Sequence, residues 1–237
     1  MIVNRLIWSC YGWKISVQAA YLAFVCCAIL LCISLSYWQW QRAQAADLRF
    51  NTYQQQELQS VSLLSDSPQD YQKVKIAGEI KQHFFLDNQI YQGVAGWHIV
   101  AEVQTAQDLL LVNLGWQPKQ NQLVLQHALP LYIEVQGVLK KPQPGFMLQA
   151  AMHDPNWPLI LQQIHIQLLN DYYDYELLPF VLYAETQVAD LIPAPIIMDN
   201  KFYMHLGYTI QWLLIAAACF LGFIYISRQE QKENEEQ

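Results

Sequence analysis

Hydrophobic residues in this chain gather into two long uncharged segments near its ends and into shorter runs between them. Residues 19–37 and 206–226 contain no charged side chain, and each has about the 20 residues that an α-helix needs to cross a bilayer core. The pattern therefore predicts two membrane-spanning helices, which we place at residues 17–40 and 205–226. The remaining chain is then divided into a tail at 1–16, a central domain at 41–204 and a second tail at 227–237.

The central domain has the short apolar runs of a β-rich fold. Residues 42–65 lack Gly and Pro, so we expect the first helix to continue as a polar helix until Ser67-Pro68. Residues 73–77 then alternate polar and apolar side chains, which is the period of a strand with one wet face. Strands are expected at 71–80, 84–91, 97–104, 109–116, 131–139 and 180–185, with a short helix within 158–173.

These elements predict an α+β membrane protein. Two terminal transmembrane helices flank a β-rich domain, built as an antiparallel sheet or an open barrel with one or two helices. Two spans place both tails on one side of the membrane. We expect these tails to be cytoplasmic and too short to fold, with the end from Gln229 disordered and the central domain extracytoplasmic.

A cleavable secretory signal is the alternative interpretation of the first apolar segment. Ala43-Gln44-Ala45 has the small-x-small form of a cleavage site. Trp38, Trp40 and Arg42 stand before those alanines, however, and this order suits a helix that leaves the bilayer through an aromatic belt. The anchored helix is therefore the favoured interpretation.

Charge and cysteine placement narrow the function of the central domain. Nine of the 13 basic residues and 16 of the 20 acidic residues lie from Arg42 to Lys201, so this region carries a net charge of about −7. Such a domain is not expected to bind nucleic acid. All five cysteines lie in the first tail or in the two apolar segments, which leaves the central domain without a disulfide or a thiolate metal site.

The familiar catalytic motifs are missing from the sequence. There is no Gly-x-Ser-x-Gly elbow, no phosphate-binding glycine loop and no dinucleotide fingerprint. The histidines include no His-x-His or His-x-x-x-His pair that would mark a local metal site. They are His83, His98, His127, His153, His165 and His205. We therefore do not expect an enzyme.

Polar and aromatic residues at the membrane boundaries are the strongest candidates for a binding site. On each predicted helix three of them share one sector. They are Trp38, Gln39 and Arg42 on the first helix, and His205, Tyr208 and Trp212 on the second. An interfacial belt explains such residues without a ligand. The alternative is a site at the outer leaflet, since a neutral histidine can be an axial ligand of haem iron while aromatic rings cover the macrocycle.

Several short motifs run in order along nearly the whole chain. They are Trp38-Gln39 with Arg42, Val74 to Gly78, Gly96-Trp97-His98, Val112 to Trp116, Val135 to Val138, and His205 to Tyr208 with Gln211-Trp212. With the two terminal spans, this order resembles the Surfeit locus protein 1 family of cytochrome c oxidase assembly factors. Two positions depart from the family pattern: Ser36 replaces a glycine, and Leu114 replaces an arginine whose phosphate, propionate or partner contacts are then in doubt.

The resemblance implies a biogenesis factor of the bacterial inner (plasma) membrane for a haem-copper oxidase. Such a protein would bind haem a, with His205 as the candidate iron ligand, and present it to the catalytic subunit of the oxidase. Haem A synthase, membrane lipid and a second copy of this chain are further candidate partners.

Three rival functions stay open at this point. A haem-free scaffold that stabilises an oxidase intermediate would need the same topology. A receptor would need a cytoplasmic signalling domain, which neither tail supplies. A haem-modifying enzyme would be expected to show paired histidines in several spans, whereas only His205 lies near the membrane.

Overall fold

The computed structural model describes residues 5–10, 13–65, 67–119, 128–143, 145, 159–173 and 176–235. The chain forms two compact units. Residues 1–51 and 199–237 make up the first unit, and residues 52–198 make up the second. The predicted site residues all belong to the first unit, so the two units are taken in turn.

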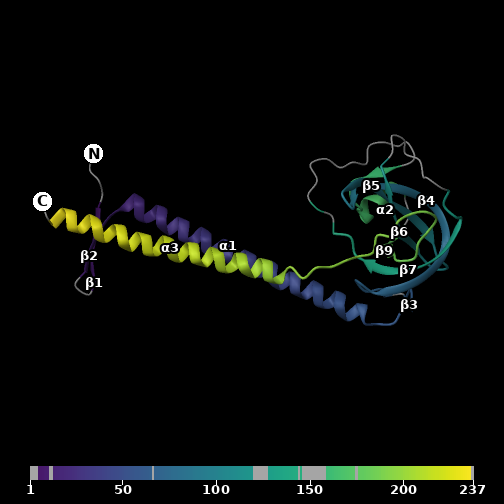
Figure 1. Ribbon diagram of the computed structural model, residues 1–237, viewed down its shortest axis with the longest axis horizontal. Helices are drawn as coiled ribbons and strands as arrows, with labels where there is room; N and C mark the ends of the chain where they lie inside the picture. Colours follow the sequence, from purple (N-terminus) through teal and green to yellow (C-terminus); the bar gives the residue numbers. More distant parts are fainter. Residues whose placement is uncertain are drawn as a thin grey trace. The chain divides into compact units, whose positions relative to one another are not determined.

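The first unit contains two long helices that run side by side in opposite directions (Figure 1). Helix α1 spans Ala19–Glu57 and helix α3 spans Phe202–Glu235. Both are long and apolar enough to cross a bilayer. The two terminal apolar helices therefore indicate a two-pass membrane protein.

Most residues that are buried on the two helices within the first unit have small side chains. Along each helix they are separated by four, seven or eleven positions, which keeps them on one face. They are Val25, Cys32, Ser36 and Ala43 on α1, and Thr209, Ala216 and Ser227 on α3. Small residues let two membrane helices approach closely, and the large apolar side chains are left for the outer faces.

Both predicted tails contain regular structure, so the prediction that they do not fold is wrong. Strands β1 (Arg5–Cys10) and β2 (Trp13–Gln18) pair as an antiparallel hairpin. Helix α3 continues to Glu235, past the expected start of disorder at Gln229. The physical reasons are local: the first segment is rich in aromatic and β-branched residues, and Glu, Gln and Lys are good helix formers.

The second unit is built around a closed five-stranded barrel. Its strands are β4 (Lys73–Tyr91), β5 (Val94–Gln104), β6 (Leu109–Pro118), β7 (Tyr132–Lys140) and β9 (Leu177–Ala184). The order around the barrel is β4-β5-β6-β9-β7, and the pairing of β7 with β4 closes it. The short strands β3 (Ser62–Leu63) and β8 (Ile160–Leu161) pair with β4, and helix α2 spans Ile166–Tyr173.

The β-rich domain between two terminal helices is confirmed, and the structure refines its sheet in three ways. The predicted strands at 71–80 and 84–91 are one strand, β4, which pairs with β7 through its first part and with β5 through its second. Strands β6 and β9 are parallel, so the sheet is mixed. The resulting strand order is that of an OB-fold, an architecture that serves many functions and does not identify one.

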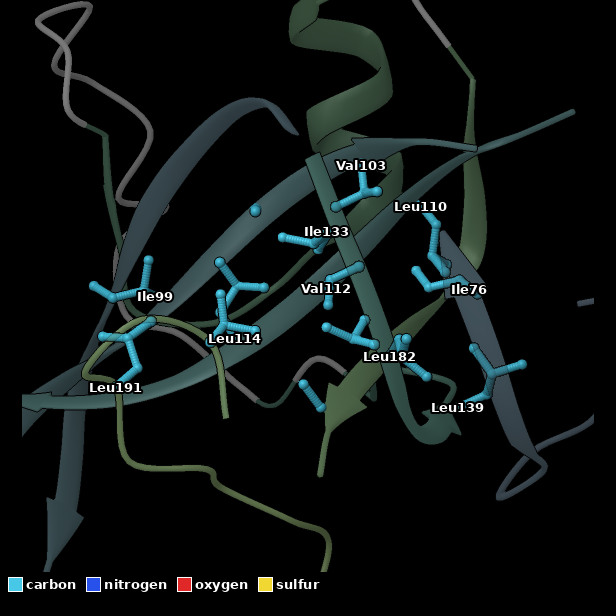
Figure 2. Close-up of a cluster of buried hydrophobic side chains, with 14 of the residues drawn as sticks. Ile76, Ile99, Val103, Leu110, Val112, Leu114, Ile133, Leu139, Leu182 and Leu191 are labelled. Atoms are coloured by element: carbon cyan, nitrogen blue, oxygen red, sulfur yellow. The ribbon is translucent and has the colours of Figure 1, made fainter. Parts of the chain in front are cut away.

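The barrel interior is a single apolar cluster drawn from all five strands. Figure 2 shows part of it, with Ile76 of β4, Ile99 of β5, Val112 of β6, Ile133 of β7 and Leu182 of β9. A second cluster lies on the opposite face of the sheet, where segment 159–169 covers alternate residues of the strands. Two apolar clusters account for the β-type runs of the sequence, because β4, β5, β6 and β9 contribute side chains to both of them.

Candidate functional site at the helix pair

The strongest candidate site lies where Gln39 of α1 meets His205 of α3. The Oε1 atom of Gln39 is 2.9 Å from Nδ1 of His205. A carbonyl oxygen can only accept a hydrogen bond, so the histidine donates from Nδ1. In the neutral ring Nε2 then carries no proton and keeps the lone pair with which an imidazole binds a metal.

The backbone around His205 is fixed by two further hydrogen bonds. The hydroxyl of Ser36, which is buried, donates to the backbone carbonyl of Thr209 at 3.1 Å across the helix contact. The hydroxyl of Thr209 donates to the carbonyl of His205 at 3.0 Å. The turn that carries His205 is therefore tied to α1 one turn away from Gln39.

Two charged residues indicate where the Gln39–His205 contact lies along the apolar segments. Arg42 lies three positions beyond Gln39 on α1, and Lys201 lies four positions before His205 on the antiparallel chain. At 1.5 Å per residue, both charges sit about 5 Å beyond the Gln39–His205 contact and at the same end. The contact is thus close to the polar boundary of the apolar segments.

Aromatic side chains surround this level and remain accessible. The guanidinium of Arg42 lies 5.4 Å from the ring centre of Trp38, a cation–π contact. Trp38 and Tyr208 are 47% and 46% exposed, and Trp212 is half-buried. Within the described residues, no hydrogen bond or ring contact joins Tyr208 or Trp212 to the other predicted site residues. The structure therefore forms two separate pairs, Gln39–His205 and Trp38–Arg42.

The structure also adds polar contacts that the sequence patterns did not predict. Asn200 accepts a hydrogen bond from the backbone N–H of Phe202 at 2.9 Å, which caps the start of α3. Its amide reaches Asp47 of α1 at 3.5 Å. An Asp-Asn pair directly before an apolar segment is a signal for such a cap, whereas the partner on α1 depends on tertiary structure.

Gly96 and Trp116, which belong to two of the sequence motifs that lie in the barrel, have structural roles. A Cβ at Gly96 would collide with the indole of Trp116 and the carbonyl of Gln117, so only glycine leaves room for that ring. The Trp116 indole donates to the carbonyl of Gln89 at 3.1 Å and lies 5.3 Å from the ring of Tyr91. These contacts hold the end of the barrel together.

His98 belongs to a buried network that makes it neutral. The side-chain oxygen of Asn113 accepts from the N–H of Gly115 at 3.1 Å, at a bulge where Gly115 has a φ of 135°. The amide nitrogen of Asn113 therefore faces His98 and donates to its Nδ1 at 2.9 Å. Burial lowers the pKa of His98 to about 4. His98 is thus a structural acceptor with its proton on Nε2.

The remaining histidines that the structure describes belong to no metal-binding cluster. Burial lowers the pKa of His83 in β4, and His165 directly precedes α2. His127 and His153 lie outside the described residues. Among the residues that are described, no group of three or more His, Cys, Asp or Glu side chains could hold a metal ion.

A comparison with known families gives one match that covers parts of both helices and the whole barrel. The model of the SURF1 family matches residues 26–217, which include both members of the Gln39–His205 pair. The chain belongs to the SURF1 family. This family is associated with the assembly of cytochrome oxidase. No curated protein matches the chain.

Both positions that depart from the pattern of the family, Ser36 and Leu114, are buried in this chain. Leu114 lies in the apolar interior of the barrel (Figure 2). Ser36 uses its hydroxyl to bond the backbone of α3. Leu114 thus packs in the apolar core, and Ser36 contributes a hydrogen bond between the helices.

Proposed function

We propose that this chain binds haem a at the helix pair and assists its insertion into the catalytic subunit of a haem-copper oxidase. The observation that carries the proposal is the Gln39–His205 hydrogen bond, which leaves the Nε2 lone pair of a boundary histidine available. Bound haem would supply an iron that accepts this lone pair. The proposal makes the protein a carrier and not an enzyme.

The other predicted site residues fit such a ligand by their chemistry. Trp38 and Tyr208 expose large apolar rings that can cover a flat macrocycle. Arg42 is exposed beside Trp38, and its five N–H donors suit carboxylates such as haem propionates. Trp212 extends the aromatic surface further along α3. The apolar helix faces suit the lipid tail of haem a, which favours a carrier at membrane depth.

We assign the contact with the oxidase subunit to the barrel. Inside the barrel His98 and Asn113 bond each other, so the Nδ1 atom of His98 is already engaged. In this proposal the barrel is extracytoplasmic and both tails are cytoplasmic, in a bacterial plasma membrane. Haem A synthase would supply the cargo.

An absorption spectrum of the full chain, purified in detergent from cells that make haem A, tests the proposal. We expect a stoichiometric haem a band that is lost in His205→Ala and kept in the matched control His165→Ala. His165 is a second half-buried histidine, and it lies in the barrel unit.

The scaffold function gives a different result in the same experiment. The Gln39–His205 and Ser36–Thr209 contacts also hold the helices together, which a haem-free scaffold would need equally. No haem in the wild-type protein, with the oxidase subunit still co-purifying, would establish the scaffold and refute the carrier.

A further inference from the structure

We infer that Gln39 is a positioning residue that fixes the tautomer and ring orientation of His205. This inference deepens the proposed function and rests on it for the identity of the ligand. Gln39 would not itself be a ligand of bound iron. It accepts the Nδ1 proton of His205, and the opposite nitrogen of the ring becomes the metal-binding atom.

The atoms of the Gln39–His205 contact determine which nitrogen of His205 carries the proton. Gln39 Oε1 is an acceptor without a proton, so the 2.9 Å contact requires a proton on Nδ1 of His205. Metal-binding histidines in proteins almost always donate their second ring N–H to a carboxylate, a carbonyl or water, which fixes the ring and makes the ligand nitrogen more basic. The side-chain carbonyl of Gln39 meets this requirement before any metal is bound.

The helix contact holds the donor and acceptor at this distance. Ser36 lies three residues before Gln39 and bonds the carbonyl of Thr209, which lies four residues after His205. Ala43, one turn beyond Gln39, is fully buried as well. Because the helix contact restrains Gln39, this side chain loses less conformational entropy when it orients the ring of His205 than a mobile side chain would lose.

His98 is the internal counterexample. Its Nδ1 also meets a side-chain amide, but the oxygen of Asn113 is occupied by Gly115, so the nitrogen of the amide faces the ring. His98 therefore keeps its proton on Nε2 and cannot offer that atom to a metal. The orientation of one amide thus separates a structural histidine from a ligand.

Nitrogen-15 NMR of the ring of His205 tests the inference without haem. The full chain in detergent micelles, free of haem and at a pH where the ring is neutral, is expected to show His205 with its proton on Nδ1. Gln39→Leu is expected to lose that preference, and Gln39→Glu, which keeps an acceptor, to retain it. Gln41→Leu is the matched control, because Gln41 is an exposed amide two residues along the same helix.

Haem titration of the same variants adds the functional readout. We expect Gln39→Leu to bind haem about 10- to 100-fold more weakly, with an altered axial-ligand spectrum. Gln39→Glu and Gln41→Leu should stay near the wild-type affinity. Helix content measured by circular dichroism shows whether each variant keeps the helix pair.

The outcomes separate the two levels of the argument. A proton on Nε2 of His205 in the wild-type chain, or an unchanged tautomer in Gln39→Leu, overturns the positioning role. A proton on Nδ1 in a chain that binds no haem overturns the haem carrier instead and leaves the Gln39–His205 pairing standing.

Discussion

The barrel and the helix pair each place a histidine against a side-chain amide, with opposite results. In the barrel, His98 accepts from Asn113, and burial keeps its pKa at about 4. In the helix pair, His205 donates to Gln39, with exposed aromatic residues nearby. Both rings are half-buried, so the comparison shows that the orientation of the amide partner, and not the depth of burial, decides which ring nitrogen carries the proton.

The largest expected effect follows a charge placed in the barrel core. Leu114→Arg places a charged side chain at a fully buried position within a cluster of apolar side chains. We expect a loss of more than about 5 kcal/mol in the free energy of unfolding, or failure to fold. Urea denaturation of the full chain in detergent, followed by tryptophan fluorescence, measures it. Leu63→Ala is the control, because Leu63 is 77% exposed. A tolerated arginine would mean that the core can open at this position.

Removal of the amide that bonds His98 should have the next largest effect. Asn113→Leu leaves both the N–H of Gly115 and Nδ1 of His98 without their partner. Since each buried group left unpaired costs about 1–3 kcal/mol, we expect a loss of about 4 kcal/mol in the same denaturation experiment. A loss below about 1 kcal/mol would contradict the buried network.

Acid should weaken the barrel through His98. The pKa of His98 is lowered by burial from 6.5 to about 4 in the folded chain. Between these two pH values the unfolded chain binds the proton and the folded chain does not. The free energy of unfolding therefore falls as the pH falls from 6.5 to about 4, and the contribution of His98 is fully present above pH 6.5. The loss should reach roughly 3 kcal/mol below the lower value.

A variant without the titrating ring isolates this effect. His83 also has a lowered pKa and acts in the same direction, so His98→Gln is compared with the wild-type chain over the same pH range. We expect the difference in unfolding free energy between the two proteins to change with pH. A constant difference would show that His98 does not titrate in this window.

The smallest expected effect on stability comes from the helix pair. Gln39→Leu removes one hydrogen bond between two helices, and such bonds are worth about 0.6 kcal/mol on average in a membrane protein. We therefore expect the thermal unfolding of Gln39→Leu to stay close to that of the wild-type chain in detergent. A loss as large as that of Asn113→Leu would assign Gln39 a structural role and erase the contrast between the two regions.

Much of the fold could be predicted from local patterns. The length of the uncharged segments predicted both helices, and alternation predicted β-strands near their observed positions. The break between 71–80 and 84–91 was wrong, because β4 continues through a register shift and no residue there stops a strand. The candidate site could be predicted only in part. Sequence spacing placed His205 and Gln39 at the same membrane level, but it could not show that the two side chains form a hydrogen bond.

The sequence by itself determined the elements of this protein, because helix length, strand alternation and the absence of charge act over neighbouring residues. Only the tertiary structure decided which nitrogen of each histidine carries the proton. That choice depends on partners far away in the chain: Gln39 and His205 are 166 residues apart, and the orientation of Asn113 depends on a bulge in β6. Hydrogen bonds between distant residues have no periodic signature, so the packing of the elements alone establishes them.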